Sequence, residues 1–268
     1  MTDPASNGAV VLVGCGRLGS AILEGWLTTE AVAPAELIIL TPSEKPAAEA
    51  ARALGARTNP PSTALAAARA VVLAVKPAYW REALGPLLAD LPSDTPIISV
   101  MAGVKTDEIE ALSGRPVARV MPTTAVAQAR GVAALWSADD KAREIGRRLF
   151  RAMADVVDLD SESQMNAATA VAGSAPAFVY AFTQALARAG EAQGLSSEAA
   201  QRLARGALRS AGAGAETGAP LADLVARIAS PGGTTRAGLD AMETAGELDR
   251  AAEAAVRGAV ERARAISG

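Results

Sequence analysis

Two glycine-containing motifs hold the residues of this chain that are best suited to chemistry. The first, Gly14-Cys15-Gly16-Arg17-Leu18-Gly19, follows a short apolar run and precedes a stretch with helical periodicity. In a strand–loop–helix unit, the first glycine permits a tight turn, the second lets a pyrophosphate approach the backbone, and the third lets the helix pack closely on the strand. Free N–H groups and the positive end of the helix dipole then favour phosphate. This context predicts a dinucleotide-binding loop rather than an ordinary glycine-rich turn, with Cys15 as a small structural residue.

The second motif is Ser230-Pro231-Gly232-Gly233-Thr234-Thr235, which precedes a predicted helix. Its two glycines free the backbone, and its hydroxyl residues suit the start of a helix. Such a turn can offer backbone N–H groups to a small carboxylate, with hydroxyl groups beside it. Taken alone, the motif is explained more simply by a capped helix after a loop.

Histidine is absent from the chain, and lysine is limited to Lys45, Lys76, Lys105 and Lys141. The absence of histidine excludes Ser-His-Asp and Cys-His catalysis, zinc sites built on histidine and a histidine general base. A single cysteine, Cys15, excludes an internal disulfide framework and metal sites built from several cysteines. No metal site is expected, and any chemistry must use carboxylates, hydroxyls, backbone groups, arginines or a bound cofactor.

Composition narrows the class of protein further. The 268 residues are 50% hydrophobic and only 3% aromatic, which excludes a disordered chain and predicts a core of alanine, valine, leucine and isoleucine. A formal net charge of −3, without a long run of either sign, argues against a nucleic-acid partner. No apolar run approaches the ~18 residues of a membrane span, and the first residues lack the basic start of a signal peptide. We expect a cytoplasmic protein with no membrane partner.

The first half of the chain alternates strand-like and helix-like segments. Apolar runs predict strands at residues 9–13, 37–40, 71–75, 97–100, 117–121 and 131–136. Helices are predicted among them at about 18–27, 44–54 and 79–89. Continuous apolar strands that alternate with helices favour a parallel sheet covered on both faces.

The second half changes character near Ser161. It is predicted to be helical throughout, at about 162–192, 197–216, 220–229, 235–245 and 247–266. These helices are rich in alanine and glycine, although glycine in a helix costs about 1 kcal/mol relative to alanine. Such a composition reflects either a biased genome or close helix–helix contact, most simply between subunits. The predicted fold is an α/β Rossmann-type dinucleotide-binding domain over residues 1–160 and an all-α domain over residues 161–268.

The end of the second predicted strand bears on which dinucleotide is bound. An NAD site usually places Asp or Glu there for the ribose 2′-OH. In this chain Glu36 comes too early and Glu44 comes too late. The other polar residues nearby suit a 2′-phosphate better, namely Thr41, Ser43, Lys45 and Arg17. We expect NADPH, with NADH as the alternative, whereas a turn that binds nothing would show no preference.

Two further strand ends carry small or special residues, Val75-Lys76-Pro77 and Met101-Ala102-Gly103. In an open parallel sheet the ligand crevice lies at the carboxyl ends of the strands. Both segments are therefore expected to line the nicotinamide side of the site. Lys76 is either a proton donor or, more simply, a solvated or cofactor-positioning charge.

The chain resembles the delta-1-pyrroline-5-carboxylate reductases over nearly its whole length. Besides the Gly14–Gly19 loop and the Ser230–Thr235 segment with Gly238-Leu239 after it, the shared motifs are Ala74-Val75-Lys76-Pro77, Ala102-Gly103-Val104, Arg119-Val120-Met121-Pro122 and Gly173-Ser174-Ala175-Pro176-Ala177-Phe178. The Ser230–Thr235 segment is the family's most specific signature. The resemblance implies reduction of a cyclic imine carboxylate to proline, with hydride from NAD(P)H.

The resemblance also implies a set of site residues. The cofactor residues would be Gly14, Cys15, Gly16, Arg17, Leu18, Gly19, Thr41, Ser43, Lys45, Ala74, Val75, Lys76, Pro77, Ala102, Gly103, Met121 and Pro122. The substrate residues would be Ser230, Gly232, Gly233, Thr234, Thr235 and Ser174. The carboxylate would sit on backbone N–H groups of Gly232–Thr234, and Thr235, as the catalytic residue, would hydrogen-bond the ring nitrogen. Family members are dimers with interlocked helical C-terminal domains, often assembled into rings.

Some positions depart from the family's pattern. Thr123 stands where the family commonly has Asn, and further departures fall at Ala172, Ala175 and Phe178. The family's ribose-contacting Asn has no clean match, because Asn59 is about two positions away. These changes bear on substrate and cofactor preference rather than on the fold.

Two alternatives to a proline-forming reductase follow from the residues. One is a paralogue on the same scaffold that reduces another cyclic imine or uses a deazaflavin. The other is a non-catalytic NADP-binding protein, against which the intact Ser230–Thr235 segment argues. A hydroxyacid dehydrogenase of the related two-domain type is excluded, because its usual lysine has no counterpart after Lys141.

Overall fold

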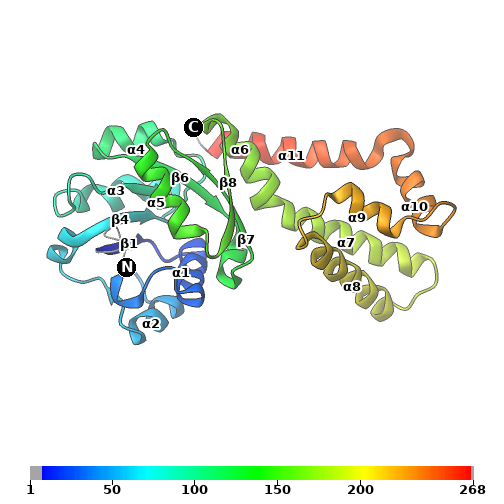
Figure 1. Cartoon of the computed structure of the whole chain (residues 1–268), viewed down its shortest axis with the longest axis horizontal. Coiled ribbons are helices and arrows are strands. Elements are labelled where there is room, and N and C mark those ends of the chain that lie inside the picture. Colours follow the sequence, from blue (N-terminus) through cyan, green and yellow to red (C-terminus); the bar gives the residue numbers. More distant parts are fainter. Residues whose placement is uncertain (1–7, 267–268) are drawn as a thin grey trace. The chain divides into compact units, whose positions relative to one another are not determined.

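The computed structural model describes residues 8–266, apart from the side chains of residues 245 and 266. The chain forms two compact units, one of Met1–Gly173 with Val260–Gly268 and one of Ser174–Ala259. In the residues described, the first unit holds a sheet with its covering helices and the second is helical (Figure 1). The predicted fold class, a Rossmann-type α/β part followed by an all-α part, is confirmed.

The described part of the chain contributes eight strands to one sheet, in the order β3-β2-β1-β4-β5-β6-β7-β8. Their bounds are Ala9–Val13 (β1), Leu37–Leu40 (β2), Arg57–Thr58 (β3), Ala68–Leu73 (β4), Ile97–Ser99 (β5), Val117–Pro122 (β6), Gly131–Trp136 (β7) and Ala154–Asp158 (β8). The strands from β1 to β6 pair in parallel. Since β1 has β2 on one side and β4 on the other, the strand order changes direction there, and such a switch point is where open α/β sheets bind ligands.

The last two strands differ from the wholly parallel sheet that the sequence pattern favours. β7 runs antiparallel to β6, with Met121 opposite Ala134, and β8 then pairs in parallel with β7. Only a short 3₁₀ turn, Thr124–Gln128, lies between β6 and β7. A parallel crossover needs a dozen or more residues, so this short connection permits only the antiparallel pairing.

Six helices belong to the first unit: α1 (Arg17–Thr29), α2 (Pro46–Ala53), α3 (Trp80–Leu84), α4 (Thr106–Ser113), α5 (Asp140–Phe150) and α6 (Met165–Ala168), counted over the residues described. The single helix expected at 79–89 is shorter, because Gly85-Pro86 after α3 turns the chain into a 3₁₀ segment. The strands β3 and β8 and the helices α4 and α5 are absent from the predicted elements. They are short or rich in charged residues, so their apolar pattern is weak.

Alternate residues of the strands point into two cores, one on each face of the sheet. On one face α1, α2 and α5 cover a core that includes Leu12, Val72 and Phe150. On the other face α3 and α4 cover a core that includes Val11, Leu73 and Trp80.

The indole of Trp26 in α1 is fully buried, and its Nε1 donates to the carbonyl oxygen of Leu149 in α5 at 2.8 Å. This bond ties together two helices that are 123 residues apart in sequence.

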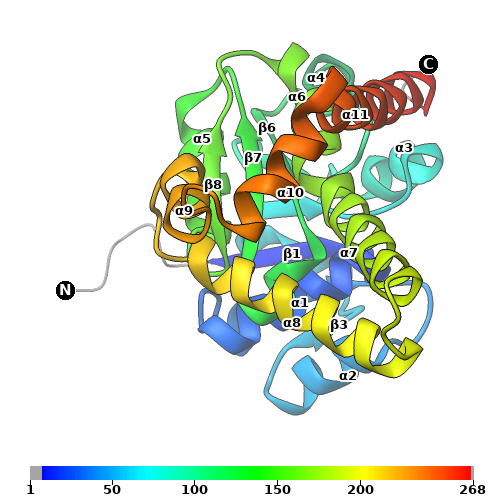
Figure 2. The same ribbon diagram turned by 90° about the vertical axis from the view of Figure 1, so that its right-hand side faces the viewer.

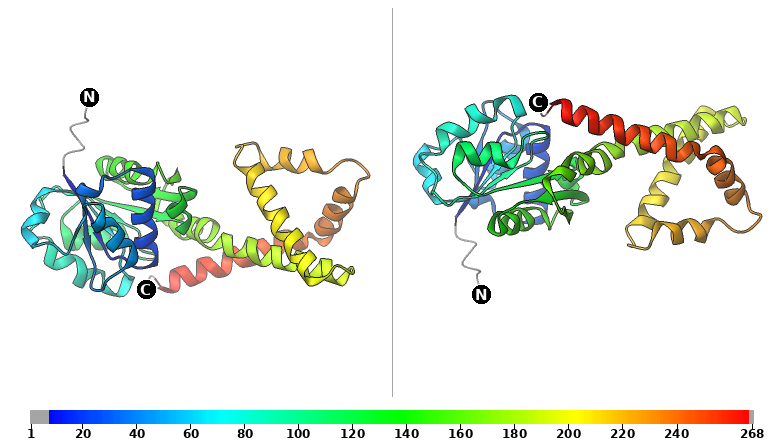
Figure 3. Two further views of the ribbon diagram at one scale, coloured as in Figure 1. Left: turned by 90° about the horizontal axis from the view of Figure 1, so that it is seen from below. Right: turned by 90° about the horizontal axis from the view of Figure 1, so that it is seen from above.

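The second unit consists of α7 (Ala175–Ala192), α8 (Ser197–Ala215), α9 (Leu221–Ile228), α10 (Thr234–Glu243) and most of α11 (Glu247–Ile266). Figure 3 shows α8, α9 and α10 succeeding one another as three sides of an open frame. The packing of α7 on α8 rests on three small buried residues, Ala187, Ala200 and Ala204. Many larger apolar side chains stay exposed, such as Tyr180 (65%) and Ile228 (70%). In one chain this unit therefore covers little of its own apolar surface.

One helical stretch among the described residues, Glu162–Ala192, is long and apolar enough to cross a membrane by length and composition alone. The prediction that no apolar run approaches the length of a membrane span is therefore wrong for this stretch. The finding is weak evidence for a membrane span, because the core helix of a soluble protein passes the same test. Its most apolar window is only 11% buried, so an apolar helix face is uncovered in the single chain.

Replacement of Trp26 by Phe is expected to lower the free energy of unfolding by about 1–3 kcal/mol, because the buried Leu149 carbonyl would lose its hydrogen bond. Chemical denaturation measures the change. A suitable control is Trp136→Phe, since the half-buried Trp136 indole makes no hydrogen bond to the described residues. Equal losses from the two substitutions would contradict a special role for the Trp26 bond.

Candidate active site

The glycine loop joins β1 to α1, and its three glycines have different geometries. Gly14 has a φ of 96°, and a Cβ there would lie 2.7 Å from the carbonyl oxygen of Ala74, so only glycine fits. A Cβ on Gly19 would collide with the carbonyl oxygen of Gly14. A Cβ on Gly16, by contrast, would meet no atom of the described chain within 4 Å. The absence of a side chain at Gly16 is therefore not needed for packing, and it leaves room for a ligand.

The first turn of α1 is suited to an anion. Gly16 is the N-cap residue, no side chain caps the helix, and the first turn carries no acidic residue. The free N–H groups and the helix dipole therefore face outward without a competing carboxylate. Arg17 is exposed at the first helical position. Cys15 is buried, with its Sγ 3.4 Å from the hydroxyl of Ser20.

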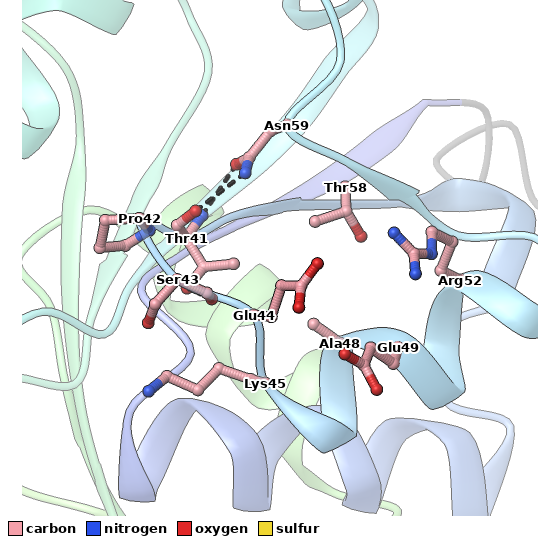
Figure 4. Close-up of a pocket in the computed structure, with 10 residues that line it drawn as sticks. All are labelled: Thr41, Pro42, Ser43, Glu44, Lys45, Ala48, Glu49, Arg52, Thr58 and Asn59. Carbon is pink, nitrogen blue, oxygen red and sulfur yellow. Dashed lines mark hydrogen bonds between the residues drawn. The ribbon is translucent and has the colours of Figure 1, made fainter.

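A pocket of about 230 Å³ opens at the carboxyl end of β2 (Figure 4). The residues that line it are Thr41, Pro42, Ser43, Glu44, Lys45, Ala48, Glu49, Arg52, Thr58 and Asn59. Three residues predicted to contact the ribose phosphate are thus brought to one pocket, whereas Arg17 does not line it. The hydroxyl of Thr41 is buried and donates to the carbonyl oxygen of Ser43 at 3.0 Å, so it is already paired. Ser43 is exposed.

The wall of this pocket is held by Asn59. Its Oδ1 accepts the backbone N–H of Thr41 at 3.0 Å, and its Nδ2 donates to the carbonyl oxygen of Thr41 at 2.8 Å. Asn59 has a φ of 45°, a left-handed conformation that Asn tolerates better than most residues. The side chain therefore fixes the turn after β2 rather than pointing freely into the pocket.

Charge of both signs lines this pocket. Glu44 and Glu49 contribute carboxylates, and Lys45 and Arg52 contribute cations. The cation of Arg52 is a candidate that the sequence reasoning missed. Helical spacing is the signal that could have found it. Arg52 lies four residues after Ala48, which also lines the pocket, so the two residues share one face of α2.

The remaining predicted cofactor residues lie at the carboxyl ends of β4, β5 and β6. β1 and β4 are joined at this edge by a hydrogen bond from the Ala74 N–H to the carbonyl oxygen of Val13 at 2.8 Å. Ala74, Val75 and Pro77 are half-buried, while Lys76 is exposed. After β5 and at the end of β6, Ala102 and Met121 share one small apolar cluster. Gly103 and Pro122 are buried beside them in sequence.

Thr123, a departure from the family's pattern, has a structural contact. Its hydroxyl oxygen accepts the N–H of Val132 at 3.3 Å, and its own N–H donates to the carbonyl oxygen of Val132 at 3.0 Å. The residue is buried at the junction of β6 and β7. The hydroxyl therefore extends the pairing of these two strands.

The Ser230–Thr235 segment lies in the second unit, where Ser230–Gly233 leads from α9 to α10 and the two threonines begin α10 (Figure 2). Gly232 has a φ of 72°, a left-handed conformation in which a side chain would be strained, so the turn favours glycine there. A Cβ on Gly233 would lie 2.6 Å from the Ser230 hydroxyl oxygen, so the Ser230 side chain would have to move. The Gly233 N–H donates to the Ser230 carbonyl oxygen at 3.0 Å and is thus paired within the turn. No side chain caps α10, and its first N–H groups are left to a ligand.

Thr234 and Thr235 are exposed, and their hydroxyls make no hydrogen bond to the part of the chain that the structure describes. The next residue, Arg236, donates from Nε to Asp240 at 2.8 Å and from Nη2 to Glu243 at 3.3 Å. The hydrogen bond to Asp240 is the main cause that raises the pKa of Arg236. These contacts lie along α10 and stabilise the helix on which both threonines stand.

Ser174, the remaining predicted substrate residue, is half-buried and ends a π-helical segment, Thr169–Ser174. This segment lies between α6 and α7, where the sequence pattern predicts uninterrupted helix. Short π-helical segments recur at functional sites, although periodicity alone does not detect them. Among the described residues, no cluster of acidic or cysteine side chains could hold a metal ion.

Two family models match the chain. One is described as pyrroline-5-carboxylate reductase dimerisation and matches residues 162–266. The other is described as NADP oxidoreductase coenzyme F420-dependent and matches residues 9–103. The first covers the helical part of the chain, and the second covers β1 to the loop after β5.

Individual relatives match almost the whole length. A pyrroline-5-carboxylate reductase of Thermus thermophilus is 36% identical and aligns with 95% of this chain and 95% of its own. A solved structure of a Coxiella burnetii pyrroline-5-carboxylate reductase has a TM-score of 0.86, 27% identity and coverage of 98% of this chain and 99% of its own. A Plasmodium falciparum pyrroline carboxylate reductase with NADP bound has a TM-score of 0.77 at 24% identity over 98% and 99% of the two chains, which shows a shared fold. On these matches, and with the glycine loop and the Ser230–Thr235 turn in place, the chain belongs to the pyrroline-5-carboxylate reductase family.

Proposed function

We propose that the protein reduces the C=N bond of 1-pyrroline-5-carboxylate to give L-proline, with NADPH as the hydride donor. The relatives that bear the name of this activity align with nearly the full chain. The observation that supports it most directly is that one chain holds both an uncapped, unobstructed glycine loop and a Gly-Gly turn with two free hydroxyls. The loop suits a dinucleotide, and the turn suits a small carboxylate.

The first unit supplies the residues for the cofactor. The backbone at Gly14–Gly19 would receive the pyrophosphate, since a Cβ at Gly16 has free space around it. Ser43, Lys45 and Arg52 would receive the 2′-phosphate in the pocket after β2, and Arg17 would add a charge at the start of α1. The ends of β4, β5 and β6 would flank the nicotinamide. When bound, NADPH supplies the hydride that adds to the carbon of the C=N bond.

The second unit supplies the residues for the substrate. The uncapped first turn of α10 would bind the carboxylate through its N–H groups. The Thr235 hydroxyl would hydrogen-bond the ring nitrogen, and Ser230, Gly232, Gly233, Thr234 and Ser174 would shape the rest of the site. Such contacts orient the imine for hydride attack and exclude water.

The proton that completes the reaction does not require a strong acid of the protein. A cyclic imine is basic enough to arrive as its iminium, whose nitrogen already carries the proton. The chain has no histidine, and hydroxyl and backbone groups suffice to orient such a substrate. Hydride transfer then leaves a neutral secondary amine.

We also propose that the protein is a homodimer through its C-terminal helices and that it works in the cytoplasm. The exposed apolar side chains of α7, α8 and α9, among them Tyr180, Leu203 and Ile228, support the dimer. The family model that matches residues 162–266 is described as a dimerisation model. A second copy of the chain would cover the apolar face that the isolated unit leaves open.

The reaction is tested by the loss of reduced-nicotinamide absorbance with racemic pyrroline-5-carboxylate, with separate NADPH and NADH reactions and detection of L-proline. Turnover to proline, faster with NADPH, is the expected result. Turnover of an imine with another ring size, or turnover only with a reduced deazaflavin, would replace the proposed substrate or cofactor. Tight NADPH binding without any turnover would overturn the enzyme proposal.

Two glycine substitutions separate packing from cofactor binding. Gly16→Ala is expected to leave the melting temperature unchanged and to weaken NADPH binding at least 10-fold, because its Cβ occupies ligand space only. Gly19→Ala is expected to lower both, since its Cβ collides with the carbonyl of Gly14. Isothermal titration and thermal unfolding measure the two quantities. Unaltered affinity in Gly16→Ala would remove the loop from the cofactor site.

Thr235→Ala is expected to reduce kcat/KM for the imine by about 10- to 100-fold, which corresponds to one lost positioned hydrogen bond of ~1.5–3 kcal/mol. Steady-state kinetics at saturating NADPH measures it. Thr235→Ser keeps the hydroxyl and is the matched control, so it should retain most of the activity. Unchanged kinetics in the alanine variant would exclude Thr235 from the mechanism.

A further inference from the structure

Glu162 joins two segments that are far apart in sequence. Its Oε1 accepts the backbone N–H of Thr106 at 2.9 Å and a hydrogen bond from Nη1 of Arg119 at 3.0 Å. Its Oε2 accepts the hydroxyl of Thr106 at 3.1 Å. Thr106 is the first residue of α4, directly after the loop that follows β5, and Arg119 lies in β6. One carboxylate therefore connects the β5–α4 loop to β6.

The same short segment makes a second contact with these two strand ends. Three residues after Glu162, Met165 is buried in a cluster with Met121 of β6 and Ala134 of β7. Ala102 of the β5–α4 loop packs against that cluster. Residues 162–165 thus hold the loop and β6 twice, once through charge and once through apolar packing.

The ion pair of Arg119 with Glu162 is costly to break because the arginine is buried. The Arg119 side chain is 5% exposed, and its Nε and Nη2 have no hydrogen-bond partner among the described residues. Glu162 is its charge partner, and its own side chain is 20% exposed. Loss of the carboxylate would leave an uncompensated buried cation, so the spacing of the two segments depends on this contact.

We propose that Glu162 is a positioning residue for hydride transfer. It fixes the β5–α4 loop, which holds Ala102 and Gly103, against the end of β6, which holds Met121 and Pro122. Glu162 does not touch the cofactor and acts through these two strand ends. The inference rests on the proposed function, in which both ends flank the nicotinamide, whereas the adenosine half of the cofactor is bound by the glycine loop and the pocket after β2.

The test uses Glu162→Gln in the full chain, with two readouts. The kcat of imine reduction is expected to fall at least 10-fold. The affinity for adenosine 2′,5′-bisphosphate, a fragment without the nicotinamide, is expected to stay within 2-fold of the parent value. A fall in both quantities would contradict an effect confined to the nicotinamide side, and it would overturn the proposal, as would an unchanged kcat.

The matched control is Glu36→Gln, which removes another partly buried ion pair, that of Glu36 with Arg69 at 2.9 Å. This pair lies where β2 and β4 begin, at the opposite ends of the strands, so kcat should stay within 2-fold. If Glu162→Gln fails to fold, the double variant Arg119→Met with Glu162→Gln removes both charges. It is expected to fold and to show the same fall in kcat at unchanged fragment affinity, and parent-like kcat in it would overturn the proposal.

A third readout separates this inference from the proposed reaction. Hydrogen exchange of the backbone amides at residues 102–106 is expected to be at least 10-fold faster in Glu162→Gln than in the parent chain. If the parent chain reduces no imine, the proposed reaction is wrong, and this exchange rate still decides whether Glu162 holds the β5–α4 loop. Unchanged exchange would refute that role of Glu162.

Discussion

The close approach of α1 to the end of β1 is the constraint on which the first unit depends. The helix starts so near the strand that a side chain at Gly19 would overlap the Gly14 carbonyl, and one at Gly14 would press on Ala74 at the end of β4. The start of α1, the end of β1 and the end of β4 therefore lie too close together for side chains at Gly14 and Gly19. No side chain caps the start of α1. The consequence is a set of N–H groups free of side-chain caps at a switch point of the sheet, and such a set suits a dinucleotide phosphate.

Around that loop the structure holds the neighbouring strand ends by polar contacts rather than by apolar packing alone. Asn59 clamps the backbone after β2, and Glu162 connects the loop after β5 to Arg119 of β6. Both contacts come from residues outside the strands that they hold. Partly buried polar contacts of this kind favour one arrangement over slightly shifted alternatives, since a shift would leave paired groups without partners.

The helices of the second unit are held together in a different way. Its helices meet through alanine, as in the cluster of Ala187, Ala200 and Ala204, and leave large side chains such as Tyr180 and Leu221 outside. Small residues permit close helix contact but bury little apolar area, so such a unit gains stability when another surface covers it. The glycines of the Ser230–Thr235 turn serve another purpose, because the left-handed φ of Gly232 would strain any side chain there and a side chain at Gly233 would displace the Ser230 hydroxyl.

By itself the sequence determined the alternation of strands and helices, the two-part fold, the glycine loop and the Ser-Pro-Gly-Gly-Thr-Thr turn, because each is encoded in local periodicity or in residues with special backbone freedom. It did not reveal the antiparallel β7, the strand β8 or the π-helical Thr169–Ser174, since apolar periodicity reports neither strand direction nor a π-helical segment and is weak in β8. Only the tertiary structure decided that Arg52 shares a pocket with Ser43 and that Glu162 meets Arg119. The contact of Glu162 with Arg119 joins segments that are 43 residues apart, so no local pattern specifies it, and the pocket forms only when the turn after β2 brings Ser43 over the face of α2 that carries Arg52.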